Sequence, residues 1–290
     1  MTASADACIA CEHALAASPW THTAFGTLHA CTHCGSLTGR PRPTAMAQTT
    51  LHDRPDYYDH PYFTLRRNAQ STRLRCRNTF SRIERAVGAG RLRGTRHLDI
   101  GCDTGTFLEA AAAQFGPIPF GVEVSRRALE AARARGVDAF CGSLDELPRD
   151  VGAFRVITAI DLIEHVPHPG ALLRAMRQRL DRDGVLYLET PNIRSVVYTI
   201  GNVFGRAPGR WARGLHDRLF PAEHIQYFTR AGLAALLQRA GFAIRAIGTR
   251  PLAGRDLGVP APLRAGLVAL QLADRVASSE ILHWVVASRS

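Results

Sequence analysis

Four cysteines near the start of the chain are spaced like metal ligands. Cys8 and Cys11 form one C-x-x-C pair, Cys31 and Cys34 form another, and 19 residues separate the two pairs. The first residues show no export signal, so we expect paired thiols of this kind to bind metal rather than to form disulfides. Four thiolates are typical ligands of structural, tetrahedral zinc. The sequence therefore predicts one structural zinc site.

A glycine-containing turn follows the apolar stretch that includes Asp99. The segment reads LDIGCDTGTF and places Gly101 and Gly105 in a G-x-x-x-G pattern before an alanine-rich helix. Glycine allows a ligand to approach the backbone closely, and the N-terminus of a helix offers free N–H groups. Dinucleotide sites have G-x-G-x-x-G instead, and an acid two residues before the first glycine would repel a pyrophosphate. That acid suits the ammonium group of an amino acid.

Polar residues at the ends of the following strands complete a candidate ligand site. Glu123 ends the second predicted strand, where a carboxylate can bind both hydroxyls of a ribose. Ser143 and Leu144 follow the third strand and can flank an adenine, and Asp161 ends the fourth strand. A ligand with a ribose, a base and a charged amino-acid end is S-adenosylmethionine, which is the predicted cofactor.

Two histidines are candidate general bases. His165 follows the fourth predicted strand, His224 lies further along the chain, and each comes directly after a glutamate. A neutral imidazole can accept a proton near neutral pH. A base is needed only where the acceptor is a hydroxyl, an acidic carbon or a protonated amine. For each histidine, a packing or helix-capping role is the alternative.

A parallel sheet is needed to bring these residues together. From about residue 65, short apolar stretches alternate with helical ones, which predicts an α/β fold with an open, doubly wound sheet. The expected strands are 97–100, 120–124, 139–141, 155–160, 184–189, 242–248 and 281–287, the last two being able to pair antiparallel. The expected helices lie near 106–114, 125–135, 169–180, 229–240 and 262–278.

Composition divides the chain into three regions. Residues 1–40 have few large aliphatic side chains and are predicted to form a small zinc-binding module that depends on its metal. Residues 41–64 are rich in Pro and Tyr and are predicted to be a linker. Residues 65–290 form the α/β domain, within which residues 193–226 interrupt the alternation and are predicted to be a lid-like insert.

The formal net charge of +11 does not by itself predict a nucleic-acid partner. All 36 basic residues are Arg, and they are spread along the chain from residue 40 onward, which indicates a coding bias rather than a phosphate-binding surface. The densest group of arginines, between residues 66 and 85, is expected on the solvated outer face of a helix. No apolar run is long enough to predict a membrane span, and without a secretory signal we expect a cytoplasmic protein.

Residues 95–248 resemble the class I methyltransferases that use S-adenosylmethionine and fold as a seven-stranded Rossmann-like sheet. The fragments LDIGCDTGTFL, GVEVS, DLIEHVPHP, LDRDGVLYLETPN and EHIQYFT…LLQRAGF follow the order and spacing of that family. The resemblance implies that Asp99, Gly101 and Gly105 contact the methionine end of the cofactor and that Asp161 borders the sulfonium and the acceptor. Asp103 stands where the family usually has glycine, which puts the shape of the methionine pocket in question.

Two narrower resemblances concern metals. The four-cysteine module and the Tyr-rich linker are similar to those of bacterial sugar C-methyltransferases, in which the module binds zinc. Asp161, Glu164 and His165 are similar to the acidic, acidic and histidine trio of the ubiquinone-pathway O-methyltransferases. They would share one face if the turn were helical and could then hold a divalent cation. Asp161 replaces a longer glutamate, so a second metal stays an open question.

The combined prediction is methyl transfer from S-adenosylmethionine to oxygen or carbon of a small molecule, such as a sugar or a natural-product intermediate. The alternative is a methyltransferase for nucleic acid or protein that is guided by the zinc module. A third, non-enzymatic hypothesis is a zinc-ribbon interaction protein with a degenerate cofactor site, motivated by Asp103. The sequence leaves open the acceptor, the choice among O-, C- and N-methylation, and the oligomeric state.

Overall fold

The computed structural model describes residues 6–24, 26–41, 68–205, 210–251, 266, 268–269, 271–272, 274–275 and 279–290. Nearly all of the predicted linker at 41–64 and much of the predicted helix at 262–278 lie outside the described residues. Within the described residues, no helix combines the length and the apolar composition that crossing a membrane requires.

The large sheet has seven strands in the order β10-β11-β8-β7-β4-β5-β6. The five strands from β8 to β6 are parallel to one another, whereas β11 is antiparallel to both β8 and β10. The bounds are β4 (Arg96–Ile100), β5 (Ile118–Glu123), β6 (Asp138–Cys141), β7 (Phe154–Ile160), β8 (Leu180–Pro191), β10 (Phe242–Arg250) and β11 (Leu282–Arg289). Central strands such as β8 are buried on both faces, which explains their continuous apolar runs. The predicted strands and the antiparallel pair are confirmed.

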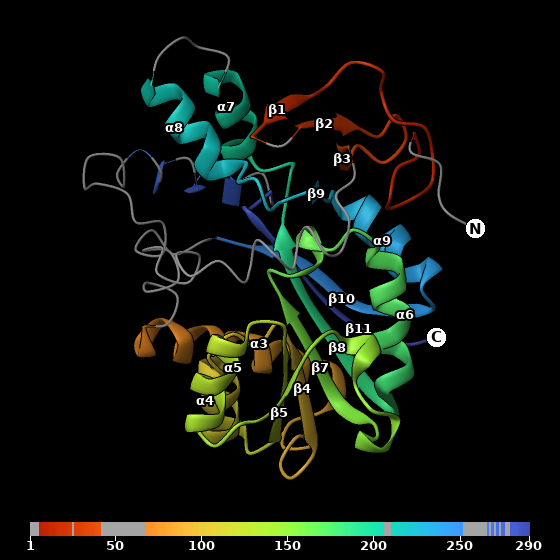
Figure 1. The fold of residues 1–290 in the computed structure, drawn as a ribbon, viewed down its shortest axis with the longest axis vertical. Coiled ribbons are helices and arrows are strands. Elements are labelled where there is room, and N and C mark those ends of the chain that lie inside the picture. The colour runs from red at the N-terminus through yellow and green to blue at the C-terminus, as the bar shows by residue number, and fades with distance from the viewer. Residues whose placement is uncertain are drawn as a thin grey trace.

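Helices cover both faces of this sheet, as predicted for a doubly wound fold (Figure 1). Helices α3, α4 and α5 lie on one face, and α6 and α9 on the other. Asn68, Ser125 and Thr229 cap three of the helices by accepting hydrogen bonds from backbone N–H groups of the first turn. The bounds are α3 (Ala69–Val87), α4 (Thr106–Phe115), α5 (Arg126–Ala134), α6 (Pro169–Arg179) and α9 (Arg230–Arg239).

The cysteine-containing segment is not folded apart from the α/β domain. Cys8 and Leu15 belong to the same apolar cluster as Leu233 and Leu236 of α9. A small antiparallel sheet also joins the two regions, in the order β1 (Thr21–Thr23), β2 (Gly26–Ala30), β3 (Leu37–Arg40) and β9 (Gln226–Tyr227). Hydrogen bonds and apolar packing therefore cross the boundary that composition suggested at residue 40.

The insert at 193–226 forms two helices, α7 (Val196–Gly205) and α8 (Arg210–Leu219), next to the small sheet (Figure 1). Phe220, just after α8, is buried in an apolar cluster with Leu28 of β2. The insert, the cysteine segment and the carboxyl ends of the central strands thus meet at one end of the molecule.

Candidate active site

The glycine turn between β4 and α4 requires both of its glycines. Gly101 and Gly105 have φ of +73° and +72°, a left-handed conformation that costs glycine little. A Cβ atom on Gly105 would also lie 2.9 Å from the Cβ of Ala132 on α5. The turn therefore packs tightly against α5 and leaves the N-terminus of α4 at the carboxyl edge of the sheet, as the prediction of a ligand turn requires.

Asp103 takes over the conformation of the glycine that it replaces. Its φ is +50°, in the left-handed region that Asp tolerates better than most residues. The N–H of Asp103 donates a hydrogen bond to Oε2 of Glu123 at 2.9 Å. The substitution thus keeps a turn shape that glycine would give, and it adds a carboxylate side chain beside the turn.

Glu123 ends β5 and holds two loops together. Its Oε2 accepts from the N–H of Asp103, and its Oε1 accepts from the N–H of Ser125 at 3.0 Å. Burial raises the pKa of this carboxyl, and the two N–H groups work in the opposite direction. Glu123 therefore lies beside the glycine turn, at the point where a ribose was predicted.

Asp99 is a buried carboxyl on β4 with a polar partner on the neighbouring strand. Its Oδ1 accepts from Oγ1 of Thr158 at 2.6 Å, and Nε2 of His97 lies 2.8 Å from the same hydroxyl. Burial raises the pKa of Asp99 to about 7, although Thr158 and the charge of Arg75 oppose the rise. Burial lowers the pKa of His97 to about 3, so the imidazole is neutral.

Arg75 of α3 lies beside the candidate site and was not predicted from the sequence. Its guanidinium lies 5.8 Å from the centre of the Phe107 ring, at the start of α4, and its charge lowers the pKa values of both Asp99 and Glu189. The prediction that the arginines at 66–85 face solvent is wrong for Arg75 and Arg82. Arg75 is half-buried, and Arg82 donates to the hydroxyl of Tyr187 at 3.0 Å. The helical period could have predicted the partial burial of these two arginines, because both lie one turn from buried Thr79.

A buried ion pair lies at the carboxyl end of β8. Glu189 is fully buried and accepts two hydrogen bonds from the guanidinium of Arg250 and a third from the hydroxyl of Tyr187 at 3.0 Å. Burial alone would raise the pKa of Glu189, but Arg250 lowers it to about 2. The carbonyl of Glu189 accepts from the N–H of Asp161 at 2.9 Å. The sequence could have indicated a buried, paired carboxylate here, because Glu189 lies inside the apolar run VLYLET.

The residues predicted to flank an adenine follow β6. Ser143 is exposed and begins a short 3₁₀ turn, Leu144–Glu146, in which Oε2 of Glu146 accepts from both N–H and Oγ of Ser143 at 2.7 and 2.9 Å. The side chain of Leu144 is buried in the main apolar core. Ser143 is thus accessible to a ligand, whereas Leu144, with its side chain in the core, could offer a ligand only its backbone.

The structure brings the two candidate bases together. The rings of His165 and His224 are edge-to-face with centroids 4.6 Å apart. Nδ1 of His165 lies 3.1 Å from the carbonyl of Glu223. Because a carbonyl can only accept, Nδ1 carries the hydrogen, and Nε2 is the basic nitrogen of the neutral ring.

The trio predicted from spacing is assembled differently. Residues 163–165 form a single 3₁₀ turn, and Asp161 before it has a φ of +51°, so no α-helical face unites Asp161, Glu164 and His165. In the part of the chain that the structure describes, the donor atoms of Glu164, His165 and His224 lie within 4.8 Å of one another instead. Oε2 of Glu164 accepts from the hydroxyl of Thr190 at 2.9 Å.

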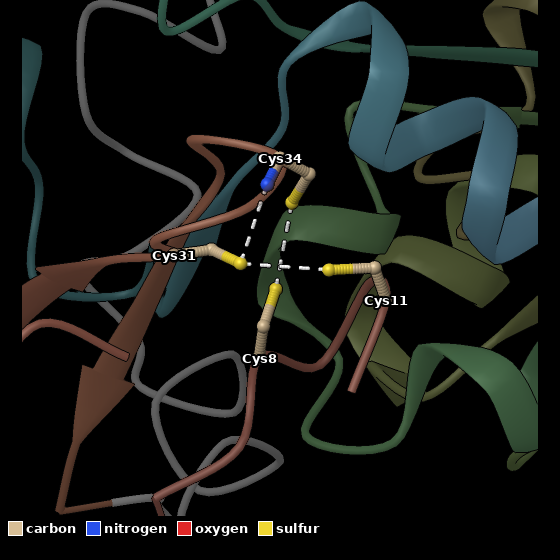
Figure 2. A group of neighbouring side chains, drawn as sticks. All are labelled: Cys8, Cys11, Cys31 and Cys34. Atoms are coloured by element: carbon tan, nitrogen blue, oxygen red, sulfur yellow. Dashed lines mark hydrogen bonds between the residues drawn. The ribbon is translucent and has the colours of Figure 1, made fainter. Parts of the chain in front are cut away.

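The four cysteines converge on one point, as Figure 2 shows. Sγ of Cys8 lies 3.7 Å from that of Cys34, and Sγ of Cys11 lies 3.4 Å from that of Cys31. Zinc–sulfur bonds of about 2.3 Å in a tetrahedron would separate sulfur atoms by about 3.8 Å. The N–H groups of His33 and Cys34 are directed at Sγ of Cys31 at 3.4 Å each. The donor set and its dimensions fit a tetrahedral metal.

Comparison with known proteins identifies the family of the α/β domain. A family model described as a methyltransferase domain matches residues 67–247. A ubiquinone biosynthesis O-methyltransferase of Coxiella burnetii is 30% identical over 159 residues, which cover 50% of this chain and 66% of that protein. One from Neisseria meningitidis is 29% identical over 164 residues, covering 52% and 69%. The chain thus matches about two thirds of the length of these relatives.

Solved structures show the same fold at low sequence identity. The magnesium protoporphyrin IX methyltransferase of Synechocystis PCC 6803, with bound S-adenosylhomocysteine, has a TM-score of 0.55 and 17% identity, covering 83% of this chain and 99% of that one. A possible histamine N-methyltransferase of Thermotoga maritima has a TM-score of 0.54 and 18% identity, covering 84% and 100%.

Proposed function

Because the chain belongs to the class I S-adenosylmethionine-dependent methyltransferases, we propose that it methylates an oxygen or a carbon of a small molecule such as a sugar or a natural-product intermediate. The observation that carries the proposal is the pairing of His165 with His224 at the carboxyl end of β7. That edge of the sheet also holds the glycine turn and Glu123. A cofactor site and a candidate base thus open on the same edge.

The chain's own residues account for each part of the cofactor. Asp99 would pair with the ammonium of the methionine end, and the half-buried guanidinium of Arg75 provides a positive charge for its carboxylate. Glu123 would accept from the ribose hydroxyls. Ser143 and Leu144 would border the adenine, and Asp161 would border the sulfonium. Gly101 and Gly105 allow the close approach.

The acceptor side needs a base and a fixed geometry. The bound cofactor supplies a methyl group on a sulfonium, and the departing thioether is neutral, so no acid is required. His165 would take the proton of the acceptor at Nε2, because the carbonyl of Glu223 holds the hydrogen on Nδ1. His224 packs against that ring and limits its rotation. The rest of the rate enhancement would come from alignment of the acceptor with the methyl group and from exclusion of water by the insert.

The proposal is tested by incubating the protein with S-adenosylmethionine labelled in its methyl group. Separate panels of acceptors would contain hydroxylated aromatics, nucleotide sugars, RNA and proteins. Label recovered on carbon or oxygen of a small molecule supports the proposal. Label found only on RNA or protein would replace it by the alternative in which the zinc module guides a macromolecule.

The raised pKa of Asp99 predicts a pH-dependent cofactor affinity. Below a pKa of about 7 the carboxyl is protonated and cannot pair with an ammonium group. Affinity for S-adenosylhomocysteine is therefore expected to fall about tenfold as the pH drops from about 8 to about 6. Calorimetry across that range measures it, and Asp99→Asn should bind weakly with no such dependence. A flat profile in the wild-type protein would show that Asp99 does not bind the ammonium.

We also propose that the four cysteines hold one structural zinc. Three of the four are nearly inaccessible to solvent, and thiolates this close together repel one another unless a cation lies between them. The segment around them has few large aliphatic residues, so the metal would contribute much of its folding free energy.

Elemental analysis of the purified protein is expected to find one zinc ion per chain. The double variant Cys8→Ser/Cys34→Ser should lose it, because two of the four ligands are removed. Cys141→Ser is the matched control and should keep it, since Cys141 lies on β6 outside the cluster. Full zinc content in the double variant would refute the assignment of these ligands.

A further inference from the structure

The metal-binding cysteines are connected by hydrogen bonds to the segment that carries His224. The carbonyl of Cys34 accepts from the hydroxyl of Thr229 at 2.7 Å. Two residues after Cys34, Oγ of Ser36 accepts from the N–H of Thr229 at 3.0 Å. Ser36 and Thr229 are both buried, so water does not compete for these bonds.

The next residues pair with the strand that follows His224. Leu37 and Thr38 lie opposite Tyr227 and Gln226 in the β3–β9 ladder. The N–H of Gly39 donates to the carbonyl of Ile225 at 2.8 Å. Ile225 comes directly after His224, so the ladder determines where the backbone of this histidine lies.

The same segment is held on its other side by the turn that carries His165. The N–H of Ile225 donates to the carbonyl of Glu164 at 3.1 Å. The side-chain amide of Gln226 donates to the carbonyls of Ile163 and Val166 at 2.7 and 2.6 Å. Ile225 and Gln226, directly after His224, are thus held between β3 and the turn of His165.

From these contacts we infer that the four-cysteine site positions the His165–His224 pair. With its ligands joined by a metal, the turn of Cys31 and Cys34 has one conformation, and β3 leaves it in one direction. The β3–β9 ladder then presses His224 against His165. Cysteines and Ser36 act here as positioning residues, with no contact to the acceptor. The inference rests on the proposed function for its effect on turnover, but not for its effect on structure.

Gly39 offers a way to disturb this connection without touching a cysteine. A Cβ atom at this position would lie 2.8 Å from the carbonyl oxygen of Ile225, so Gly39→Ala must push β3 away from the backbone of Ile225. Gly266→Ala is the matched control, because a Cβ there meets no atom of the described residues within 4 Å. Ser36→Ala is a second, milder variant that removes the acceptor for the N–H of Thr229.

The experiment compares these proteins, and zinc-depleted wild type, by four measurements. These are zinc content, affinity for S-adenosylhomocysteine, hydrogen exchange of residues 221–229, and the NMR shifts of the histidine rings. Gly39→Ala and Ser36→Ala should keep zinc and near-normal affinity, yet show faster exchange at 221–229 and a shifted His224 ring. Zinc depletion should reproduce the exchange and the shift. The turnover number of both variants should fall by about tenfold or more, with a smaller change in KM.

Unchanged exchange and unchanged histidine shifts after zinc depletion would overturn the inference. So would a Gly39→Ala protein with zinc whose turnover and histidine shifts match those of Gly266→Ala. A wild-type protein without methyl transfer, in which zinc depletion still loosens 221–229, would contradict the proposed function while supporting the structural connection.

Discussion

Replacing Glu123 by alanine is expected to weaken binding of S-adenosylhomocysteine by about tenfold or more. Charge-assisted hydrogen bonds from a carboxylate to two ribose hydroxyls contribute about 1.5–3 kcal/mol each. The structure adds a second reason, because Glu123 also accepts from the N–H groups of Asp103 and Ser125 and so holds the glycine turn in place. Titration calorimetry on the purified variant measures the loss.

Two further variants separate binding from folding. Glu130→Ala removes an exposed glutamate from the neighbouring helix α5 and should bind like wild type. Glu123→Gln keeps an acceptor oxygen but loses the charge, so its affinity should lie between those of the wild type and Glu123→Ala. Circular dichroism would verify that each variant is folded. Wild-type affinity in a folded Glu123→Ala protein would show that β5 does not carry the ribose site.

Replacing His165 by glutamine is expected to lower turnover by about a hundredfold, because loss of a general base has an effect of that size. Affinity for S-adenosylhomocysteine should barely change, since in the proposed mechanism the side chain would contact the acceptor rather than the cofactor. His224→Gln should also lower turnover, because it removes the ring that packs against His165. The double variant should be little worse than His165→Gln alone, as expected for residues that act together.

The control is His168→Gln, an exposed histidine three residues further along the same loop. Its turnover should equal that of the wild type. Near-normal turnover in His165→Gln together with a large loss in His224→Gln would show that His224, and not His165, is the base. Normal turnover in both variants would mean that the acceptor is already deprotonated and that alignment alone drives the reaction.

Local patterns predicted most of the sheet. Each strand from β4 to β8 is a short apolar run, and helices begin at residues such as Asn68, Ser125 and Thr229, which have the capping side chains that sequence rules expect. The glycines of the turn could be predicted for the same reason, because the local turn itself requires the positive φ of Gly101 and Gly105. Such features depend on residues that are neighbours in the chain.

Contacts between distant segments were not predictable in this way. The pairing of Leu37 with Tyr227 joins residues that are far apart in sequence, and β9 is too short to have a period of its own. The contact between His165 and His224 has the same origin, so spacing along the chain indicated Asp161 as a partner instead. Arg75 was missed because composition placed it among solvated arginines, although the helical period points it inward.

Titration of the wild-type protein with S-adenosylhomocysteine tests the central claim most directly. The claim is that Asp99, Gly101, Gly105 and Glu123 form a working cofactor site in spite of Asp103. We expect binding of one molecule per chain, competition by S-adenosylmethionine, and weaker binding as the pH falls below about 7, the pKa of Asp99. A folded protein that binds neither compound would contradict this claim, and only the proposed zinc site of the four cysteines would then stay open to test.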